Sequence, residues 1–308
     1  MKGEYLVDFL EGDFHLPESL LGTWLRESSL NLVWAITGLC KSHFCMGIAW
    51  AVASGGPFLR WTCPRPRKVG LADGEMGRIE VKNRLETLAT SQPEQPANEF
   101  LKVLTLDHFG TLGMPNLSTP EGQRVYDAEF ADRDLIIIDN LITCSFPTDK
   151  WDDDVKQWDR IQKWALGHRR NGKALIFVHH AGKSGDQLGT SKRTAIMNTV
   201  ISLRKARGSQ NGLAAEMHFD KTRSYLGDDA EALYLTYTTT EVGSFWDWST
   251  LQDHKASEVE LRRNMKMKDA EIARELGMSL FEIRRLSQKV NHYAGAKEIA
   301  LPEGDEDF

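Results

Sequence analysis

Five runs rich in apolar residues, none of them alternating with polar ones, constrain the fold of this 308-residue chain more than any other feature. Unbroken apolar runs are typical of strands that are buried on both faces, as in a parallel sheet. Stretches with helical, amphipathic spacing separate the runs, so strands and helices alternate. This order predicts an α/β fold with a doubly wound, mostly parallel sheet. The expected strands are Leu30–Thr37, Lys68–Ala72, Leu101–Thr105, Asp134–Asp139 and Ala174–His179.

The pattern changes after Thr199, where strand-like segments follow one another with little helix between them. This predicts an antiparallel extension of the same sheet, built from Val200–Leu203, Ala214–Phe219 and Leu233–Thr238. From about Ser257 the chain becomes a charged helical segment, and its last residues are acidic. The expected parts are an N-terminal segment (1–28), the α/β domain (29–245), a helical unit (257–293) and a disordered acidic tail (298–308).

Charge and hydropathy exclude several classes of protein. The net charge of -6 excludes a uniformly basic coat for nucleic acid, though not a local basic patch. The longest apolar run, Met46–Ala53, is far shorter than the roughly 18 residues that cross a membrane. The first residues are acidic and lack the pattern of a signal peptide, which favours a cytoplasmic protein without membrane contact. The four cysteines form no CxxC pair, so we expect reduced thiols and no cysteine metal site.

The segment AITGLCKS (Ala35–Ser42) follows the first strand and opens the first helix, where a Walker A loop would lie. Backbone N–H groups at such a helix start bind phosphate oxygens, so we expect ATP here. Lys41 would reach the β- and γ-phosphates, and Ser42 would bind Mg²⁺. Cys40 departs from the usual glycine, whose missing Cβ lets the loop approach the phosphates closely. The residues expected to contact the nucleotide are Thr37, Gly38, Leu39, Cys40, Lys41, Ser42 and His43.

Polar residues end three other strands, at the edge of the sheet where ligands bind in such folds. Asp139 ends an apolar strand in the Walker B manner and would hold Mg²⁺ together with Ser42. Glu75, in the sequence LADGE, would orient or deprotonate the attacking water. His179 and His180 would sense the γ-phosphate. The alternatives are a buried strand end for Asp139, a solvated turn for Glu75 and a structural role for the histidines.

Seven motifs within about residues 5–245 resemble, in their order, those of hexameric RepA-type plasmid replicative helicases. The motifs are LLGTWL, AITGLCKSH, GIAWAVASGGPFL, DGEM, DLIIIDN, FVHHAGK and HFDKTR. These proteins are P-loop ATPases of the RecA/DnaB-like and AAA type. The resemblance implies the same roles for the residues named above. It also implies a ring in which Lys221 and Arg223 serve the ATP of a neighbouring subunit. Such an arginine is worth roughly 10³–10⁵ in rate in related enzymes. The alternative for this pair is a solvated strand end.

Residues 267–289 have the spacing of a helix-turn-helix unit. Ala273 allows the helices to approach closely, Gly277 makes the turn, and Ser279 caps the second helix. From Lys255 to Lys297 there are ten Lys or Arg and six Asp or Glu, a local net charge of +4 that favours DNA binding. The alternative is a helical hairpin that packs on the ATPase domain or on a neighbour. The residues expected to face DNA are Ser279, Phe281, Arg284, Arg285 and Lys289.

These observations predict a DNA-acting protein that binds ATP and Mg²⁺ and hydrolyses ATP between the subunits of a homo-oligomeric ring, expected to be a hexamer. Single-stranded DNA would pass through the ring, and duplex DNA would bind the helix-turn-helix. Because Cys40 crowds the phosphate loop, a second hypothesis is a poorly hydrolysing or inactive descendant that serves as a nucleotide-gated DNA-binding adaptor or transcriptional regulator. A third hypothesis, a dinucleotide-dependent oxidoreductase, is disfavoured because no GxGxxG motif follows the first strand.

Overall fold

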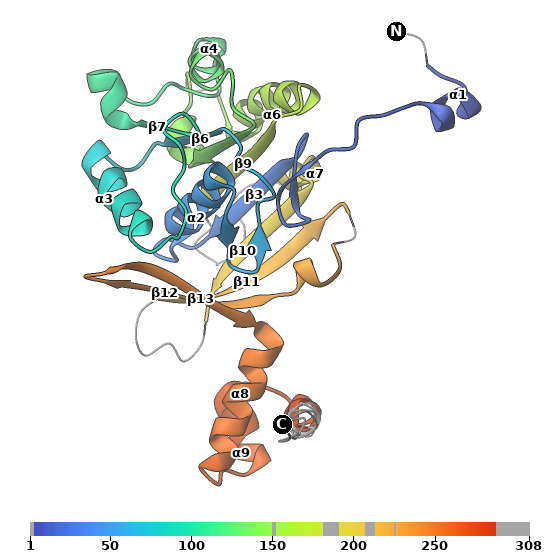
Figure 1. The fold of residues 1–308 in the computed structure, drawn as a ribbon, viewed down its shortest axis with the longest axis vertical. Helices are drawn as coiled ribbons and strands as arrows, with labels where there is room; N and C mark the ends of the chain where they lie inside the picture. The colour runs from blue at the N-terminus through green and yellow to red at the C-terminus, as the bar shows by residue number, and fades with distance from the viewer. Residues whose placement is uncertain (1–2, 150–151, 181–190, 207–212, 225, 288–308) are drawn as a thin grey trace, which may run out of the picture.

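The structure is a computed structural model that describes residues 3–149, 152–180, 191–206, 213–224 and 226–287. Within these residues, a nine-stranded sheet with the order β13-β12-β11-β10-β3-β9-β8-β6-β7 forms the centre of the molecule (Figure 1). The strands from β10 to β7 are parallel, and β11, β12 and β13 extend the sheet antiparallel beyond β10. The bounds are β3 Leu30–Ala35, β6 Val69–Asp73, β7 Leu101–Thr105, β8 Leu135–Asp139, β9 Ala174–His180, β10 Thr199–Lys205, β11 Leu213–Thr222, β12 Leu233–Thr240 and β13 Gly243–Thr250.

The central parallel strands are buried on both faces, as their unbroken apolar runs predict. In β3, Val33 and Ala35 belong to one core cluster, whereas Leu32 and Trp34 belong to the other. Helices supply the opposite wall of each cluster. The first is covered by α2 (Lys41–Ser54) and α3 (Arg78–Ala89), and the second by α4 (Pro120–Glu129), α5 (Leu141–Cys144) and α6 (Asp154–Arg170). The predicted doubly wound α/β fold is therefore confirmed.

All the expected strands form, with ends within three residues of the predicted ones, and the antiparallel extension is confirmed. Strand β13 was not predicted. It lies at the edge of the sheet, and only its first two residues are buried, so its sequence carries a weak apolar signal. Two short hairpins were also missed, because strands of two or three residues show no periodicity. They are β1 (Ser19–Leu21) with β2 (Leu25–Arg26), and β4 (Pro57–Phe58) with β5 (Trp61–Thr62).

The C-terminal helices start directly from the sheet. Strand β13 ends at Thr250, whose hydroxyl accepts a hydrogen bond from the Asp253 N–H (3.0 Å) and caps α8 (Leu251–Asn264) without a connecting loop. The charged helix thus begins before the predicted Ser257. α9 (Asp269–Leu276) and the helical residues 280–287 pack on α8 below the sheet in Figure 1. Their shared core consists of Val259, Ile272, Ala273, Ile283 and Leu286.

The remaining elements are α1 (Leu6–Glu11), α7 (Ser191–Ala195) and the 3₁₀ helices η1 (Leu106–Leu112) and η2 (Gly227–Ala230). Across the described ranges, every helix is too short or too polar to cross a membrane. Lys289 and the acidic tail 298–308 lie outside the described residues, so predictions about them stay predictions. That the C-terminal helices bind DNA also stays a prediction.

Candidate functional site

The carboxyl ends of β3, β6, β8 and β9 meet at one edge of the sheet. Ala35 of β3 pairs with His180 of β9, and Asp73 of β6 pairs with Asp139 of β8. Next to these strand ends is a cleft of about 260 Å³. Its lining contains most of the residues that the sequence predicted for nucleotide binding and hydrolysis. The lining residues are Thr37, Gly38, Cys40, Lys41, Ser42, His43, Glu75, Met76, Arg84, His180 and Leu213.

The phosphate loop leaves β3 at Ala35 and enters α2 at Lys41. Gly38 has φ +85°, and a Cβ built there would meet nothing within 4 Å, so its role is the turn itself. Cys40, the N-cap residue of α2, has φ 52° and ψ 24°, which is the left-handed conformation that glycine adopts without strain. Among the residues that the structure describes, no side chain caps the helix at this position. The first N–H groups of α2 thus remain available for an anion, as in other phosphate-binding helix starts.

Lys41 is only 7% exposed and lies among acidic groups. Its Nζ donates a long hydrogen bond to the Ile36 carbonyl (3.4 Å). Burial lowers the pKa of Lys41, whereas attraction to Asp139 and Glu75 raises it. The side chain therefore extends along the loop toward the acidic strand ends, where a γ-phosphate would need a cation.

Asp139 is buried beside Ser42 and Asp73. Its pKa is raised to about 7, first by burial and then by the neighbouring Asp73 and Glu75 carboxylates. The Ser42 hydroxyl donates a hydrogen bond to this carboxyl group, which partly offsets the rise in pKa. Burial also raises the pKa of Asp73, whose Oδ1 accepts the N–H groups of Glu75 (2.9 Å) and Met76 (2.8 Å). The sequence pointed to two acids after the second strand but assigned a role to Glu75 alone.

These oxygen atoms fit a magnesium ion that arrives with a nucleotide. The buried Oδ2 of Asp73 has no hydrogen-bond partner among the described residues, and the Ser42–Asp139 pair offers a hydroxyl and a carboxylate side by side. Magnesium prefers oxygen ligands and commonly takes one or two from the protein and the rest from phosphates and water. The described part of the chain contains no cluster of three or more His, Cys, Asp or Glu that could hold a metal ion.

The two predicted histidines separate into different environments. His180 lies in the cleft, where its Nε2 is 2.9 Å from Glu75 Oε1 and 3.0 Å from Asn140 Nδ2. Its Nδ1 is 3.4 Å from the Thr37 hydroxyl, so His180 joins Glu75 to the phosphate loop. His179 is buried, contacts Arg193, and lines a second cavity of about 420 Å³ between α5 and α6. Of the two histidines, only His180 therefore lies in the cleft with Lys41 and Glu75.

Two predicted loop residues use their side chains for packing. Leu39 is buried in the core. The His43 ring packs on Tyr237 of β12 (4.5 Å between ring centres), and its Nδ1 is 2.7 Å from the Tyr237 hydroxyl. Burial, with a smaller effect of Arg84, lowers the pKa of His43 to about 4. The imidazole is therefore neutral near pH 7, and it connects the start of α2 to the antiparallel strands.

Arg84 is a residue of the cleft that sequence reasoning missed. It comes from the middle of α3, and its charge lowers the pKa of both the Cys40 thiol and Asp73. Within the described ranges, no carboxylate forms an ion pair with Arg84. A half-buried guanidinium without a carboxylate partner suits an anionic ligand. Its position in the middle of a helix carries no signal in the sequence that could have indicated it.

Lys221 and Arg223 lie at the other end of the sheet. Lys221 of β11 pairs with Val200, at the start of β10, whereas the phosphate loop follows the other end of β3. Lys221 Nζ donates to the carbonyls of Thr194 (2.5 Å) and Ala195 (3.1 Å), at the end of α7. Arg223 Nε donates to the Met197 carbonyl (3.0 Å). The length of the strands thus separates the pair from the phosphate loop of the same chain.

Replacing Asp139 by asparagine tests the electrostatics of the cleft. A carboxyl whose pKa rises on folding from 3.8 to about 7 favours the folded state below pH 4. That contribution is lost as the pH rises through 7. Asp139→Asn removes this titration. In the absence of nucleotide, the free energy of unfolding of the variant should therefore exceed that of the parent by an amount that grows between pH 4 and pH 8, up to about 4 kcal/mol. Thermal melts at a series of pH values measure this.

A matched control for that experiment is Asp132→Asn. Lys68 and Arg133 hold the pKa of this exposed carboxyl at about 2, so its carboxylate stabilises the folded state above pH 4. The variant should therefore be less stable than the parent above pH 4, the opposite of the effect expected for Asp139→Asn. An Asp139→Asn melting temperature that tracks the parent at every pH would contradict the assignment of a costly buried charge.

Comparisons with known proteins concern the family and the fold. A sequence profile described as an AAA domain matches residues 3–186. A solved structure, the flagellar accessory protein FlaH from Methanocaldococcus jannaschii, is similar with a TM-score of 0.50 and 13% identity, over 72% of this chain and 90% of that one. A KaiC-like protein from Pyrococcus horikoshii OT3 (TM-score 0.49, 11% identity, 72% and 91% covered) and the RadB recombinase (0.48, 13%, 71% and 91%) are also similar.

A comparison with curated proteins found no match. At these low identities the structural likeness concerns the fold alone. Together with the mostly parallel sheet and its antiparallel strands, it shows the RecA-like α/β fold that the sequence predicted.

Proposed function

The chain belongs to the AAA domain family, and because it also has a RecA-like fold, we propose that it binds ATP with Mg²⁺ and hydrolyses it between identical subunits. The observation that supports this most is that Lys41, Ser42 and Glu75 line one cleft beside an open helix N-terminus, with Asp139 buried behind Ser42. Magnesium with the nucleotide would supply charge neutralisation on the phosphate oxygens. We assign Ser42 and Asp139 to hold it and Lys41 to bind the terminal phosphates.

Glu75 is the group that we assign to the attacking water. It lies at the exposed side of the cleft, where His180 contacts one of its carboxylate oxygens at 2.9 Å. The same ring is near Asn140 and Thr37, so it is held in one orientation. We infer that His180 positions Glu75, and that the contact between His180 and Glu75 changes when a phosphate displaces the Thr37 hydroxyl from the His180 ring. Catalysis would then depend on positioning and on charge stabilisation.

Assembly follows from the place of Lys221 and Arg223. Since the strands separate this pair from the phosphate loop of its own chain, we assign it to the nucleotide of a neighbouring subunit. A repeated contact of this kind is head-to-tail, and it closes into a ring when the rotation between subunits permits. We propose a ring, expected to be a hexamer, of a cytoplasmic protein that resembles RepA-type helicases and acts on single-stranded DNA.

The C-terminal helices are the part that we assign to duplex DNA, as a helix-turn-helix. Gly277 has φ 64°, and the Ser279 hydroxyl caps the next helix by accepting the Glu282 N–H (3.2 Å). Phe281, Arg284 and Arg285 are exposed on that helix. Exposed arginines beside an exposed aromatic ring suit contact with DNA phosphates and bases.

Turnover of ATP at several protein concentrations, with and without single-stranded DNA, tests the proposed function. Because one chain holds the phosphate loop and its neighbour holds Arg223, the rate per chain should rise with protein concentration until assembly is complete. Single-stranded DNA should raise it further. A measurable rate that is constant per chain from nanomolar to micromolar protein would contradict the shared site.

The second hypothesis, a nucleotide-gated DNA-binding adaptor, is favoured by Cys40. The thiol is half-buried in the cleft, and burial raises its pKa to about 11, so it is protonated and contributes no reactive thiolate. Its Cβ and sulfur occupy space that a glycine would leave to the phosphates. Weak hydrolysis would then leave binding as the function.

Replacing Cys40 by glycine separates the two hypotheses. We expect Cys40→Gly to bind ATP about threefold to tenfold more tightly, because the cleft widens. The variant should also be stabilised by about 1 kcal/mol, because the left-handed conformation costs a non-glycine residue roughly that much. Titration calorimetry and thermal melts measure both effects. If turnover rises together with affinity, the thiol has slowed an ATPase; if affinity rises and turnover stays absent, the adaptor is supported.

Lys266→Gly is the matched control for this variant. Lys266 has φ 64° and lies in the turn between α8 and α9, outside the cleft. It should show the same gain in stability with no change in ATP affinity. An unchanged affinity of Cys40→Gly would mean that the loop accommodates the sulfur.

A further inference from the structure

One extra residue interrupts the pairing between β10 and β11. The pairing is regular as far as Phe219 and resumes one position late at Lys221, so Asp220 between them has no partner on β10. This irregularity is a β-bulge, and it lies directly before the Lys221/Arg223 pair. Bulges change the direction of the side chains beside them and are common next to functional sites.

The bulge determines on which face of the sheet Lys221 lies. Residues two apart in an unbroken strand share a face, so Lys221 would otherwise lie with Phe219, which packs on the first core cluster. Instead, Lys221 lies opposite Val200, whose side chain belongs to the second cluster. Met197, just after α7, belongs to that cluster too, and Arg223 donates to its carbonyl. The extra residue therefore turns the Lys221/Arg223 pair to the face on which the end of α7 lies.

The carboxylate of Asp220 fixes the bulge by accepting three hydrogen bonds. Its Oδ2 accepts from Trp34 Nε1 of β3 at 2.9 Å. Its Oδ1 accepts from the Ser202 hydroxyl (3.0 Å) and from Arg204 Nη2 (2.6 Å), both of β10. Trp34 and Ser202 are buried, and the Asp220 side chain is only 25% exposed. A carboxylate suits this place because both of its oxygens accept hydrogen bonds, and it ties β11 to the next two strands of the sheet.

The same contacts engage the charge of Asp220 away from the Lys221/Arg223 pair. Arg204 forms the ion pair with Asp220, whereas within the described ranges no carboxylate forms an ion pair with Lys221 or Arg223. Burial, followed by the like charge of Arg223, lowers the pKa of Lys221. Two neighbouring cations that donate to backbone carbonyls and have no carboxylate partner suit an anionic ligand such as a phosphate.

We propose that Asp220 is a positioning residue for the Lys221/Arg223 pair. Through its three hydrogen bonds it holds the bulge, orients the pair toward the triphosphate of the neighbouring subunit and leaves both cations without a carboxylate partner. Asp220 itself touches no phosphate. This role rests on the proposed sharing of the ATP site between subunits. Since a misplacement of about 1 Å costs on the order of 10²-fold in rate, loss of the carboxylate should slow hydrolysis at the neighbour's site without changing nucleotide binding by the same chain.

Two substitutions of Asp220 in the full chain test this role. Turnover of fully assembled Asp220→Ala should fall about 10- to 100-fold, less than in Arg223→Ala, and its ATP affinity should stay within about twofold of the parent. Asp220→Asn keeps the shape of the side chain but replaces an acceptor oxygen by an N–H donor that faces another donor. Its turnover should therefore fall as well, even if the alanine variant folds poorly. Turnover equal to that of the parent in the folded variants would overturn the proposal.

Mixtures of variants show which half of the shared site Asp220 serves. Lys41→Ala disables the phosphate loop and keeps the Lys221/Arg223 pair, whereas Arg223→Ala does the reverse. Turnover should rise above that of either variant alone when Asp220→Ala is mixed with Lys41→Ala, because some junctions then join an intact loop to a well-placed pair. It should stay low when Asp220→Ala is mixed with Arg223→Ala, because neither chain supplies a well-placed pair. A variant that is merely unstable would not distinguish between these two partners.

The mixtures also separate the role of Asp220 from the shared site itself. Suppose that Lys41→Ala recovers turnover with Arg223→Ala but not with Asp220→Ala. The shared site then holds, and Asp220 does not position the pair. If neither mixture recovers turnover although the subunits exchange, the shared site is wrong and the role of Asp220 falls with it.

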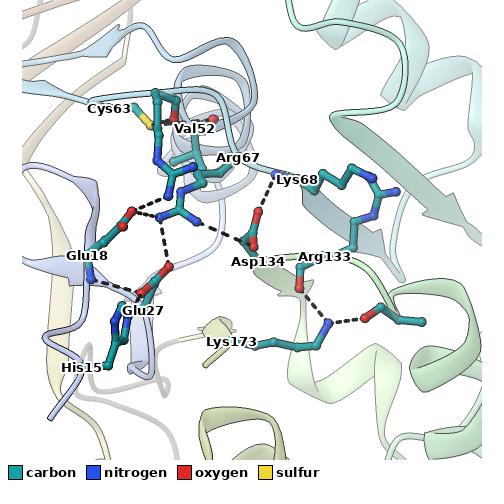
Figure 2. Close-up of polar contacts among 12 residues, drawn as sticks. His15, Glu18, Glu27, Val52, Cys63, Arg67, Lys68, Arg133, Asp134 and Lys173 are labelled. Atoms are coloured by element: carbon teal, nitrogen blue, oxygen red, sulfur yellow. Dashed lines mark hydrogen bonds and ion pairs between the residues drawn. The ribbon is translucent and has the colours of Figure 1, made fainter. Parts of the chain in front are cut away.

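Asp134→Ala is the matched control, because Asp134 also joins neighbouring strands and also pairs with an arginine. Figure 2 shows its carboxylate, which accepts the Lys68 N–H (2.9 Å) at the start of β6 and lies 3.9 Å from Arg67 Nη1. Three strands, β10, β3 and β9, separate its strand β8 from β11. Thermal melts should show a loss of stability in this variant too, whereas its turnover should match that of the parent. An equal loss of turnover in Asp134→Ala and Asp220→Ala would show that stability alone sets the rate, which would also overturn the proposal.

Discussion

Arg223→Ala is expected to lower ATP turnover by about 10³-fold or more, at protein concentrations where the parent is fully assembled. The loss follows because the guanidinium would stabilise charge on the phosphoryl group that a neighbouring subunit holds. ATP affinity should change little, since the phosphate loop of each chain is untouched. Steady-state turnover and equilibrium binding of a fluorescent ATP analogue measure the two quantities separately.

Arg223 also has a structural role, because its Nε donates to the Met197 carbonyl. Arg169→Ala is therefore a matched control, since Arg169 Nε also donates to a backbone carbonyl, that of Ser28 at 3.1 Å. The control should lose stability but retain turnover. Similar turnover in Arg223→Ala and the parent would show that the proposed contact with a neighbour is wrong.

Lys41→Ala is expected to reduce turnover by about 10²–10³-fold, with ATP affinity reduced as well. The fold should tolerate the change, because among the described residues Lys41 makes a single, long hydrogen bond, to the Ile36 carbonyl. Lys173→Ala is the matched control: Lys173 is a partly buried lysine that donates to three backbone carbonyls on the side of the sheet away from the cleft. That variant should lose stability while its remaining folded fraction retains ATP affinity.

Mixing the two inactive variants provides the most direct evidence on shared sites. When the Arg223→Ala chain supplies the phosphate loop of a junction and the Lys41→Ala chain supplies the arginine, that junction contains an intact phosphate loop and an intact Arg223. Turnover should therefore reappear on mixing, to roughly a quarter of the parent rate if chains assemble at random. No recovery from subunits that demonstrably exchange would place Arg223 outside the neighbour's site.

Much of the fold could be predicted, because apolar runs that are buried on both faces leave a pattern that does not depend on distant contacts. The strands from Leu30–Ala35 to Ala174–His180 formed close to their expected ends. Their order then implied which strand ends meet. Since Asp139, Glu75 and the loop before Lys41 each follow a strand, the sequence alone placed them at one edge of the sheet.

Other features were hidden because they depend on packing between distant segments. Arg84 reaches the cleft from one face of α3 and does not follow a strand, so the strand pattern of the sequence does not indicate its position. The adjacent histidines looked equivalent in the sequence, but alternation along β9 sends His179 and His180 to different environments. The left-handed conformation of Cys40 was suggested only by the missing glycine, and the structure shows it directly.

The absence of a connecting loop between β13 and α8 has a consequence for any ring that the chain forms. Thr250 belongs to the strand and caps the helix, so no linker separates the C-terminal helices from the sheet. Rotational symmetry repeats every feature of a subunit at the same height along its axis. A closed ring would therefore carry all of its C-terminal helices at one height along the axis, and its two ends would be chemically different.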